Sequence, residues 1–495
     1  MTYTILDCYT DEPAGLGVPP YLGTYPRYLY GALGDAYYLT IDDVRLWKRY
    51  ASKKPDKGRE VKTNTKVYNL TRNYADVGKI LQKTKTLIVI VGVQTPGKYL
   101  SAVPGTLPEI YDLIKDLPCR KVMTGPVAIG GTRLEGGKGV EKADMSLFDE
   151  VDFNYLGINE YAKINEYAVK GASILDQIPY PVVLEIETGK GCDIGHCSFC
   201  TEPLKNRVLY RDKKPVFEEI AALRKKGALY FRLGKQTCFY SYLHGNVAEI
   251  ESLLKGVAAL KPKMLHIDNV NPVKVVGSRG IEITKLVVQY CTPGNIAAFG
   301  VESFDEEVVK ANTLNTYPDV AYKAAQIINQ YGKERGWNGM PKFLPGINLI
   351  FGLMKESKKT FEENMRWLTR FLEEDLWLRR INIRQVVPFE GTRLYEEAGT
   401  KYVKKNKRHY WSWRRKIREA IDYPMLKKVV PAGTILREVR TEIYDGKTTF
   451  ARQMGSYPLI VGIKGRLPLD TFYDIRVTDH MLRSITGEVA QKETA

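Results

Sequence analysis

Six short apolar runs that alternate with helical patterns constrain the fold of this chain more than any other feature of its sequence. Each run has the length and the β-branched or aromatic content of a buried strand. The segments between them show helical spacing, as in Val247, Ile250 and Leu254. Strands that alternate with helices predict a parallel (β/α)6 sheet, which places its functional site at the carboxyl ends of the strands. The runs are residues 182–186, 228–234, 264–268, 296–302, 347–353 and 381–387.

Three cysteines follow the first of these runs, in the loop GCDIGHCSFC. Cys192, Cys197 and Cys200 allow three interpretations. A structural zinc site needs four closed ligands, and His196, which could be offered as the fourth, lies between the cysteines where the geometry is cramped. Three unrelated core cysteines are not expected in a polar loop with glycines. A [4Fe–4S] cluster uses three thiolates and leaves its fourth iron open for a substrate or cofactor.

The remaining cysteines, the N-terminal stretch, the hydrophobicity and the length indicate where the chain works and how many domains it has. Cys8, Cys119, Cys238 and Cys291 are scattered singly and form no disulfide framework, which predicts a reducing, cytoplasmic setting. The stretch MTYTILDCYTDEP has neither a basic region nor an apolar run, so no signal peptide is expected. No segment approaches the roughly 20 apolar residues of a membrane span, and no membrane partner is expected. A chain of 495 residues should hold two or three domains.

Residues 182–395 resemble the radical S-adenosylmethionine (SAM) superfamily. The usual loop of that superfamily is C-x3-C-x2-C with an aromatic residue before the last cysteine, whereas this chain has C-x4-C-x2-C with Phe199 at the aromatic position. The segments FGVESFDEEVVKANTLN, PGINLIFGLMKESKKTFEEN and RQVVPFEGTRLYE are similar to its fourth, fifth and sixth strand regions. The resemblance implies a partial (β/α)6 barrel with a [4Fe–4S] cluster on the three cysteines and SAM on the open iron. It also implies an electron donor such as ferredoxin or flavodoxin, whose electron cleaves SAM to methionine and a hydrogen-abstracting 5′-deoxyadenosyl radical.

The same resemblance implies SAM-binding roles for side chains at the carboxyl ends of the strands. Phe199 is expected against the adenine, and Glu302 is expected to bind the ribose. Residues 234–236 follow the second strand, where the family binds the methionine moiety. Arg384, on the sixth strand, could meet the SAM carboxylate through two hydrogen bonds. The full set is Phe199, Gly234, Lys235, Gln236, Glu302, Ser303, Asn348 and Arg384.

Two further side chains follow the second strand and are candidates for a catalytic role. Cys238 and Tyr240 could face the cavity as hydrogen donors or relays. The alternative is a core cysteine and a packed tyrosine. For the charged residues at the strand ends, the alternative is the solvated start of a loop.

Residues 1–175 form a separate predicted domain. TILDCY, AYYLTI, TLIVIVG and KVMTGPVAIGG have the pattern of strands, and helical segments lie between them, which predicts an open, Rossmann-like α/β domain. It resembles the cobalamin-binding domain of many radical SAM enzymes, through its PP-LG-YL segment and through Gly130 and Gly131. The usual D-x-H-x-x-G motif is missing, so a bound cobalamin should lack the histidine ligand of that motif. The alternative is a degenerate domain kept for packing or substrate binding.

The C-terminal part carries over half of the net charge of +17. Residues 401–430 interleave basic residues with Trp411 and Trp413, a pattern typical of phosphate binding combined with base stacking. Residues 431–495 contain short strands with glycine turns, which predict a small β-barrel with a hairpin at Asp445-Gly446. The barrel resembles the OB-like TRAM domain of RNA-modifying radical SAM enzymes. The alternative is a basic linker helix that packs its tryptophans on the barrel.

The predicted organisation is a Rossmann-like domain at 1–175, a radical SAM core at 176–400, a basic linker at 401–430 and a β-barrel at 431–495. The stretches DEPAGLGVPPYLGTYPRY, CSFCTEP and HIDNVNP resemble a group of archaeal radical SAM proteins.

Two functions follow from this organisation. The first is a radical SAM enzyme that modifies RNA, most simply tRNA. The second is a cobalamin-dependent radical SAM methyltransferase that acts on a protein, lipid or small molecule. A methylthiotransferase is a weaker third, because it needs three N-terminal cysteines and only Cys8 and Cys119 precede the loop.

Overall fold

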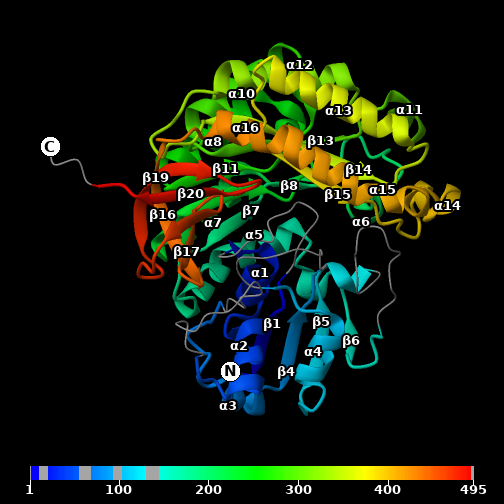
Figure 1. The fold of residues 1–495 in the computed structure, drawn as a ribbon. Helices are drawn as coiled ribbons and strands as arrows, with labels where there is room; N and C mark the ends of the chain where they lie inside the picture. Colours follow the sequence, from blue (N-terminus) through cyan, green and yellow to red (C-terminus); the bar gives the residue numbers. More distant parts are fainter. Residues whose placement is uncertain (1, 10–20, 55–68, 93–102, 130–143, 492–495) are drawn as a thin grey trace. The chain divides into compact units, whose positions relative to one another are not determined.

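The computed structural model describes residues 2–9, 21–54, 69–92, 103–129 and 144–491 (Figure 1). The chain divides into two compact units. The first comprises residues 1–135, 140–187 and 211–231, and the second comprises residues 136–139, 188–210 and 232–495. No helix in the described ranges is long and apolar enough to cross a membrane.

A five-stranded parallel sheet in the order β3-β1-β4-β5-β6 lies at the centre of the first unit. Leu6, Leu39 and Val89 project from its strands into a buried apolar cluster. Thr40 ends β3 and begins α2 through a capping box with Asp43. The predicted Rossmann-like α/β fold is confirmed. The elements are β1 (Tyr3–Asp7), β3 (Tyr37–Thr40), α2 (Ile41–Tyr50), α3 (Val77–Lys83), β4 (Thr86–Ile90), α4 (Leu107–Ile114), β5 (Arg120–Thr124) and β6 (Glu150–Val151).

Further helices of the first unit pack closely on one another. A side chain at Gly31 would place its Cβ 1.9 Å from the carbonyl oxygen of Tyr167, so α1 and α5 approach at backbone distance there. Glu219 is fully buried and pairs with the guanidinium groups of Arg27 and Arg211. These elements are β2 (Tyr21–Leu22), α1 (Thr24–Leu33), α5 (Tyr161–Lys170), β7 (Val183–Glu187) and α7 (Lys213–Lys225).

Parallel strands alternate with helices from β7 to β15, and all six strands expected from the apolar runs are present. The sheets have the orders β11-β10-β7-β2 and β12-β13-β14-β15, so the strands follow one another in chain order, as in a partial (β/α)6 barrel. The remaining elements are β10 (Tyr230–Gly234), α8 (Val247–Ala259), β11 (Met264–Ile267), β12 (Asn269–Val270), α10 (Ser278–Tyr290), β13 (Asn295–Glu302), α12 (Pro318–Gly332), β14 (Phe343–Phe351), α13 (Lys358–Glu373) and β15 (Arg380–Gln385).

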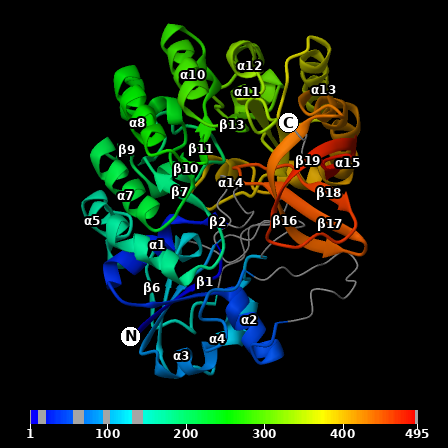
Figure 2. The same ribbon diagram turned by 90° about the vertical axis from the view of Figure 1, so that its left-hand side faces the viewer.

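A closed five-stranded barrel ends the second unit, as the short strands predicted (Figure 2). Its strand order is β16-β17-β18-β20-β19, and Asp445 pairs with Thr448 around the expected hairpin turn. The basic linker before it is helical. The elements are α15 (Lys401–Ile417), a π-helical turn (Arg418–Asp422), α16 (Tyr423–Val429), β16 (Ile435–Asp445), β17 (Thr448–Gln453), β18 (Val461–Lys464), β19 (Phe472–His480) and β20 (Ile485–Val489).

The C-terminal barrel contacts the amino ends of strands in the second unit. Lys263, directly before β11, pairs with Glu438 of β16 at 2.6 Å. The Gln453 side chain donates to the carbonyl of Asn338, which precedes β14. His266 of β11 contacts the Ser456 hydroxyl at 3.1 Å, beyond the end of β17. The barrel therefore lies at the opposite ends of these strands from their carboxyl termini.

Candidate cofactor site around the three cysteines

The three loop cysteines lie between β8 (Gly189–Lys190) and α6 (Glu202–Lys205). Cys192, Cys197 and Cys200 are all half-buried and all carry free thiols. The backbone N–H of Gly195 donates to the sulfur of Cys192 at 3.4 Å, and that of Glu202 donates to the sulfur of Cys200 at 3.5 Å. The loop thus directs a backbone N–H donor toward each of two sulfurs. Such donors favour a thiolate over a thiol.

Buried hydrogen bonds fix this loop to the ends of neighbouring elements. The hydroxyl of Ser198 bonds the amide oxygen of Asn312 at 2.7 Å, and the same oxygen accepts the N–H of Met354 after β14. The Thr237 hydroxyl donates to the carbonyl of Gly191 at 2.9 Å. Gly191 has φ +79°, and a Cβ there would lie 2.4 Å from the carbonyl oxygen of Arg207, so only glycine fits. The loop is therefore held as a rigid part of the second unit.

The thiols lie close enough to influence one another electrostatically. Burial, the charges of the other two cysteines and the charge of Glu302 raise the pKa of Cys197 to about 12. Burial is also the main cause that raises the pKa of Cys200 to about 11. A group of buried sulfurs of this kind ionises when a cationic metal centre binds it, because the metal replaces lost hydration with direct bonds. The donor set therefore fits a cluster that takes three thiolates.

The zinc alternative makes a different geometric demand. Zinc draws its ligands together around one ion, whereas a cluster distributes its thiolates over separate irons. Within the described ranges, no three His, Cys, Asp or Glu side chains converge on a single-ion site. His196, the potential fourth zinc ligand, is exposed.

Glu302 ends β13 beside the cysteine loop. It has φ +64°, and the strand register shifts between Gly300 and Glu302. A Cβ at Gly300 would lie 3.1 Å from the Oε1 atom of Glu302, so the carboxylate folds back over that glycine. Its Oε2 atom is buried and has no hydrogen-bond partner among the residues described. Burial raises the pKa of Glu302 to about 8, against an opposing effect of Arg384, so the group suits a hydrogen bond with a ligand hydroxyl.

Gln236 presents a second buried polar group after β10. Both polar atoms of its side-chain amide are buried without a partner in the described part of the chain. A Cβ at Gly189 would lie 2.9 Å from the Oε1 atom of Gln236, so this glycine makes room for the amide. Lys235 has φ +69°, and the carbonyl of Gly234 accepts the N–H of Thr188 at 3.2 Å. A buried amide without partners is a costly feature that a bound polar ligand would relieve.

Asn348 and Arg384 lie on neighbouring strands and share a face. Asn348 is in register with Gly300, and Arg384 is in register with Ile350, two residues further along β14. Because alternate residues of a strand project to the same side, both side chains lie on the face of Gly300. Arg384 lies close enough to Glu302 to lower the pKa of that carboxyl group. The structure thus brings Asn348, Arg384 and Glu302 to one side of the sheet.

The remaining expected residues have more ordinary surroundings. Phe199 packs against the apolar cluster that contains Leu353 and Leu394. The Ser303 hydroxyl is buried and accepts the N–H of Asp305 at 3.1 Å, just before α11 (Glu306–Ala311). This hydrogen bond gives the Ser303 hydroxyl a local structural role. Binding of SAM by Ser303 stays a prediction.

Cys238 and Tyr240 are both buried with their polar atoms engaged. The sulfur of Cys238 accepts the N–H of Asn271 at 3.3 Å, and the Tyr240 hydroxyl bonds that of Thr284 at 2.9 Å. Burial raises the pKa of both groups. These are the surroundings that the packing alternative requires, and a hydrogen-donor role for either side chain stays a prediction.

Several polar residues of this region were not identified from the sequence. Asp193, inside the cysteine loop, accepts the Ser241 hydroxyl at 3.1 Å and pairs with Lys274 at 2.7 Å. Arg232 of β10 forms a fully buried ion pair with Asp268. The ion pair of Arg232 could have been expected from the sequence, because the apolar run ALYFRLG contains this arginine and a buried charge needs a partner.

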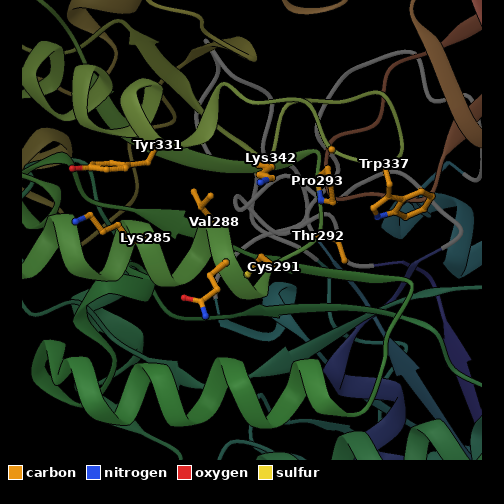
Figure 3. A pocket seen from close by; sticks show the side chains of 10 residues that line it. Lys285, Val288, Cys291, Thr292, Pro293, Tyr331, Trp337 and Lys342 are labelled. Atoms are coloured by element: carbon orange, nitrogen blue, oxygen red, sulfur yellow. The ribbon is translucent and has the colours of Figure 1, made fainter.

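A pocket of about 560 Å³ lies elsewhere in the second unit (Figure 3). It is lined by α10, α12 and the segment before β14, and Lys285, Tyr331 and Trp337 contribute to its wall. The ammonium of Lys285 lies 5.2 Å from the centre of the Tyr331 ring. Pro293, also in the wall, directly precedes β13, so this pocket is at the amino end of the strand whose carboxyl end holds Glu302. It is therefore separate from the cysteine site.

Comparisons with known proteins place the chain among archaeal sequences. No family profile matches it. An uncharacterised protein of Methanocaldococcus jannaschii is 42% identical over 531 residues, which cover 98% of this chain and 93% of that protein. An uncharacterised protein of Archaeoglobus fulgidus is 37% identical over 508 residues, which cover 98% of this chain and 90% of that protein.

Solved structures with a related arrangement include two SAM-dependent enzymes. TsrM of Kitasatospora setae, a radical SAM methyltransferase with cobalamin and a [4Fe–4S] cluster bound, is similar with a TM-score of 0.47 at 13% identity, over 79% of this chain and 73% of that chain. The cobalamin-dependent SAM radical enzyme OxsB is similar with a TM-score of 0.42 at 12% identity, over 85% of this chain and 58% of that chain. By its sequence, the chain belongs to the same archaeal protein family as the Methanocaldococcus and Archaeoglobus proteins.

Proposed function

We propose that this chain is a radical SAM enzyme that modifies RNA, most simply tRNA. The observation that carries the proposal is the loop of three half-buried free cysteines at the carboxyl end of a parallel strand. The loop lies beside the buried Oε2 atom of Glu302, which has no hydrogen-bond partner in the described part of the chain. Sites of parallel α/β sheets lie at this end of the strands. Three thiolates are the ligand set of a cluster with one open iron.

Each part of the site has a task under this proposal. Cys192, Cys197 and Cys200 would hold a [4Fe–4S] cluster, which with bound SAM supplies a hydrogen-abstracting 5′-deoxyadenosyl radical after one-electron reduction. The Glu302 carboxylate would accept a hydrogen bond from the ribose, and the buried Gln236 amide would bind the amino acid part of SAM. Arg384 would bind the SAM carboxylate. An external ferredoxin or flavodoxin would deliver the electron.

Features of α15 support RNA as the substrate. The helix carries many basic residues, and Trp411 is 65% exposed beside Arg414, whose guanidinium lies 5.3 Å from its ring. An exposed ring next to a cation suits a nucleobase next to a phosphate. The expectation that Trp413 also offers a stacking face is wrong. Trp413 is buried and stacks on Phe361 of α13, with ring centres 5.3 Å apart.

The substrate assignment predicts a change in tRNA. Anaerobically reconstituted and reduced protein, incubated with SAM and unmodified tRNA transcripts, should produce a nucleoside of altered mass after digestion. The measurement is liquid chromatography with mass spectrometry, and SAM with a deuterated methyl group shows whether that methyl group is transferred. The Cys200→Ala protein is the control and should leave every nucleoside unchanged. Protein that consumes SAM but alters no nucleoside would contradict RNA as the substrate.

A cobalamin-dependent methyltransferase of a protein, lipid or small molecule is the second candidate. The parallel sheet β3-β1-β4-β5-β6 favours it, because an open α/β sheet of this kind can hold a nucleotide-like cofactor at its carboxyl edge. Gly130 and Gly131, which would approach the cofactor tail, lie outside the described residues. Corrinoid bound to the purified protein should show the absorption of the base-off form. A spectrum of histidine-ligated cobalamin would contradict the prediction that bound corrinoid has no histidine ligand, which follows from the missing D-x-H-x-x-G motif.

A further inference from the structure

Five arginines meet along the edge strand β15 of the second unit. Arg380 and Arg384 are in register with Gly346 and Ile350 of β14, so both project from the same face of the sheet. The other three come from α15, the π-helical turn and the turn between β19 and β20. We call these residues the arginine row: Arg380, Arg384, Arg414, Arg418 and Arg483.

Contacts with the protein hold members of the arginine row in place, and two of the row's N–H groups have no acceptor within the described ranges. Arg418 donates to the carbonyl of Ile381 at 2.5 Å and pairs with Asp422. The guanidinium of Arg380 lies 4.1 Å from the centre of the Tyr457 ring. The Nε atoms of Arg414 and Arg418 are buried and have no hydrogen-bond partner within the described ranges. Arginine N–H groups without acceptors in a fixed position are suited to receive an anion.

The charges of the row act on one another. Partial desolvation and the charges of Arg418, Arg414 and Arg380, opposed by Asp422, lower the pKa of Arg483 to about 10, although its side chain is exposed. Burial, followed among the charged neighbours by Arg384 and Arg418, also lowers the pKa of Arg380. Clustered like charges destabilise a folded protein unless an anion compensates them. Arg384 also acts on Glu302, and Glu302 acts on Cys197, so the end of the row at Arg384 lies near the cysteine site.

The surroundings of the outer end indicate the kind of anion. Arg483 lies in a turn with Met481 and Leu482, which are 57% and 41% exposed. Trp411 is exposed beside Arg414. Guanidinium groups bind the oxygens of a phosphodiester through paired hydrogen bonds, and exposed apolar and aromatic side chains next to them stack on bases. A simple inorganic anion would use the arginines alone, whereas a nucleic acid strand uses both.

We propose that the arginine row binds consecutive phosphates of a single-stranded RNA segment and leads that segment to the cysteine site. The inference rests on the proposed function, which makes RNA the substrate. It adds the path by which a nucleotide reaches the site: past the β19–β20 turn, along the outer edge of β15, to Arg384 and Glu302.

The test compares two double variants that remove the same charge. Arg414→Gln with Arg483→Gln removes the outer end of the row, and Arg415→Gln with Lys416→Gln removes two exposed cations from the same helix. Binding of a fluorescein-labelled tRNA transcript is measured by anisotropy at several salt concentrations. The row variant should bind about tenfold more weakly and reduce the slope of log affinity against log salt by about 1.4, since each single-strand phosphate contact contributes about 0.7. The matched variant should lose less than about threefold.

The outcomes separate this inference from the proposed function. Equal losses of RNA affinity in the two variants, or no loss in either, would show that cations attract RNA without a defined binding site. Either result would overturn the arginine row as a binding site but would leave RNA binding by the protein intact. A parent protein without salt-dependent RNA binding would overturn both. Arg414→Lys with Arg483→Lys keeps the charge and should restore the salt slope but only part of the affinity, because lysine cannot form the paired hydrogen bonds. Equal thermal unfolding midpoints of all the variants ensure that binding differences are not due to unfolding.

Discussion

Replacing Cys192, Cys197 and Cys200 together by alanine should abolish stable iron binding, whereas the parent protein should hold about four irons per chain after anaerobic reconstitution. The three thiols belong to one loop, and Ser198 and Thr237 fix that loop through hydrogen bonds. Without them the loop offers no thiolate to a cluster. Iron and acid-labile sulfide analysis, together with the absorption spectrum, provide the measurement.

Cys291→Ala is the matched control for this experiment. Cys291 lies at the wall of the separate pocket before β13, and the protein should keep its iron when this thiol is removed. Loss of iron in the control would mean that the ligand set has been assigned incorrectly. One tightly bound zinc per chain in the parent, lost in the triple variant, would favour the zinc alternative.

Replacing Trp413 by alanine should lower the free energy of unfolding by about 3–5 kcal/mol, as expected for a buried tryptophan. Its ring stacks on Phe361 and lies 5.7 Å from Phe351, so the truncation leaves a cavity between α15, α13 and the end of β14. Urea-induced unfolding followed by circular dichroism measures the change. At low urea, the folded fraction of this variant should bind RNA as the parent protein does.

Trp411→Ala is the counterpart two residues away. Trp411 is 65% exposed, so its loss should change the free energy of unfolding by less than about 0.5 kcal/mol. If RNA is the ligand, the same substitution should weaken binding by about 1–3 kcal/mol through lost stacking, with little change in salt dependence. A Trp411→Ala protein with parental RNA affinity would contradict the proposal that Trp411 stacks on an RNA base. A stable Trp413 variant would contradict the packing of α15.

The fold class could be predicted from the sequence because it is encoded in local periodicity. Six apolar runs separated by helical spacing became β7, β10, β11, β13, β14 and β15. The Asp445-Gly446 turn and the short strands around it indicated the closed barrel. The three-cysteine loop was found by the same kind of signal, since its cysteines lie close together in the chain.

The shape of the site could not be predicted, because it depends on contacts between distant segments. The Oε2 atom of Glu302, which has no hydrogen-bond partner among the described residues, follows a register shift in β13, and the carboxylate lies over Gly300. The arginine row joins residues 380 and 483, which neither spacing nor composition connects. The separate environments of Arg414 and Arg415 likewise depend on which side of α15 meets β15 and the barrel.

The error over Trp413 had a signal in the sequence. Val403, Tyr410, Trp413 and Ile417 are all buried, and they recur at intervals of three, four and seven residues on one side of α15. That spacing is typical of the apolar face of a helix. Trp411 lies off this face and is exposed. The interleaving of aromatic and basic residues therefore reflected two faces of one helix, and only one of them is available to a ligand.

The central claim, that the cysteine site supports radical SAM chemistry, has one direct measurement. Anaerobically reconstituted protein is reduced with dithionite, mixed with SAM, and analysed by chromatography for 5′-deoxyadenosine and methionine. Both products should form with the parent protein, and neither should form with the protein lacking Cys192, Cys197 and Cys200. Iron-loaded, reduced protein that leaves SAM intact, with and without RNA present, would contradict it.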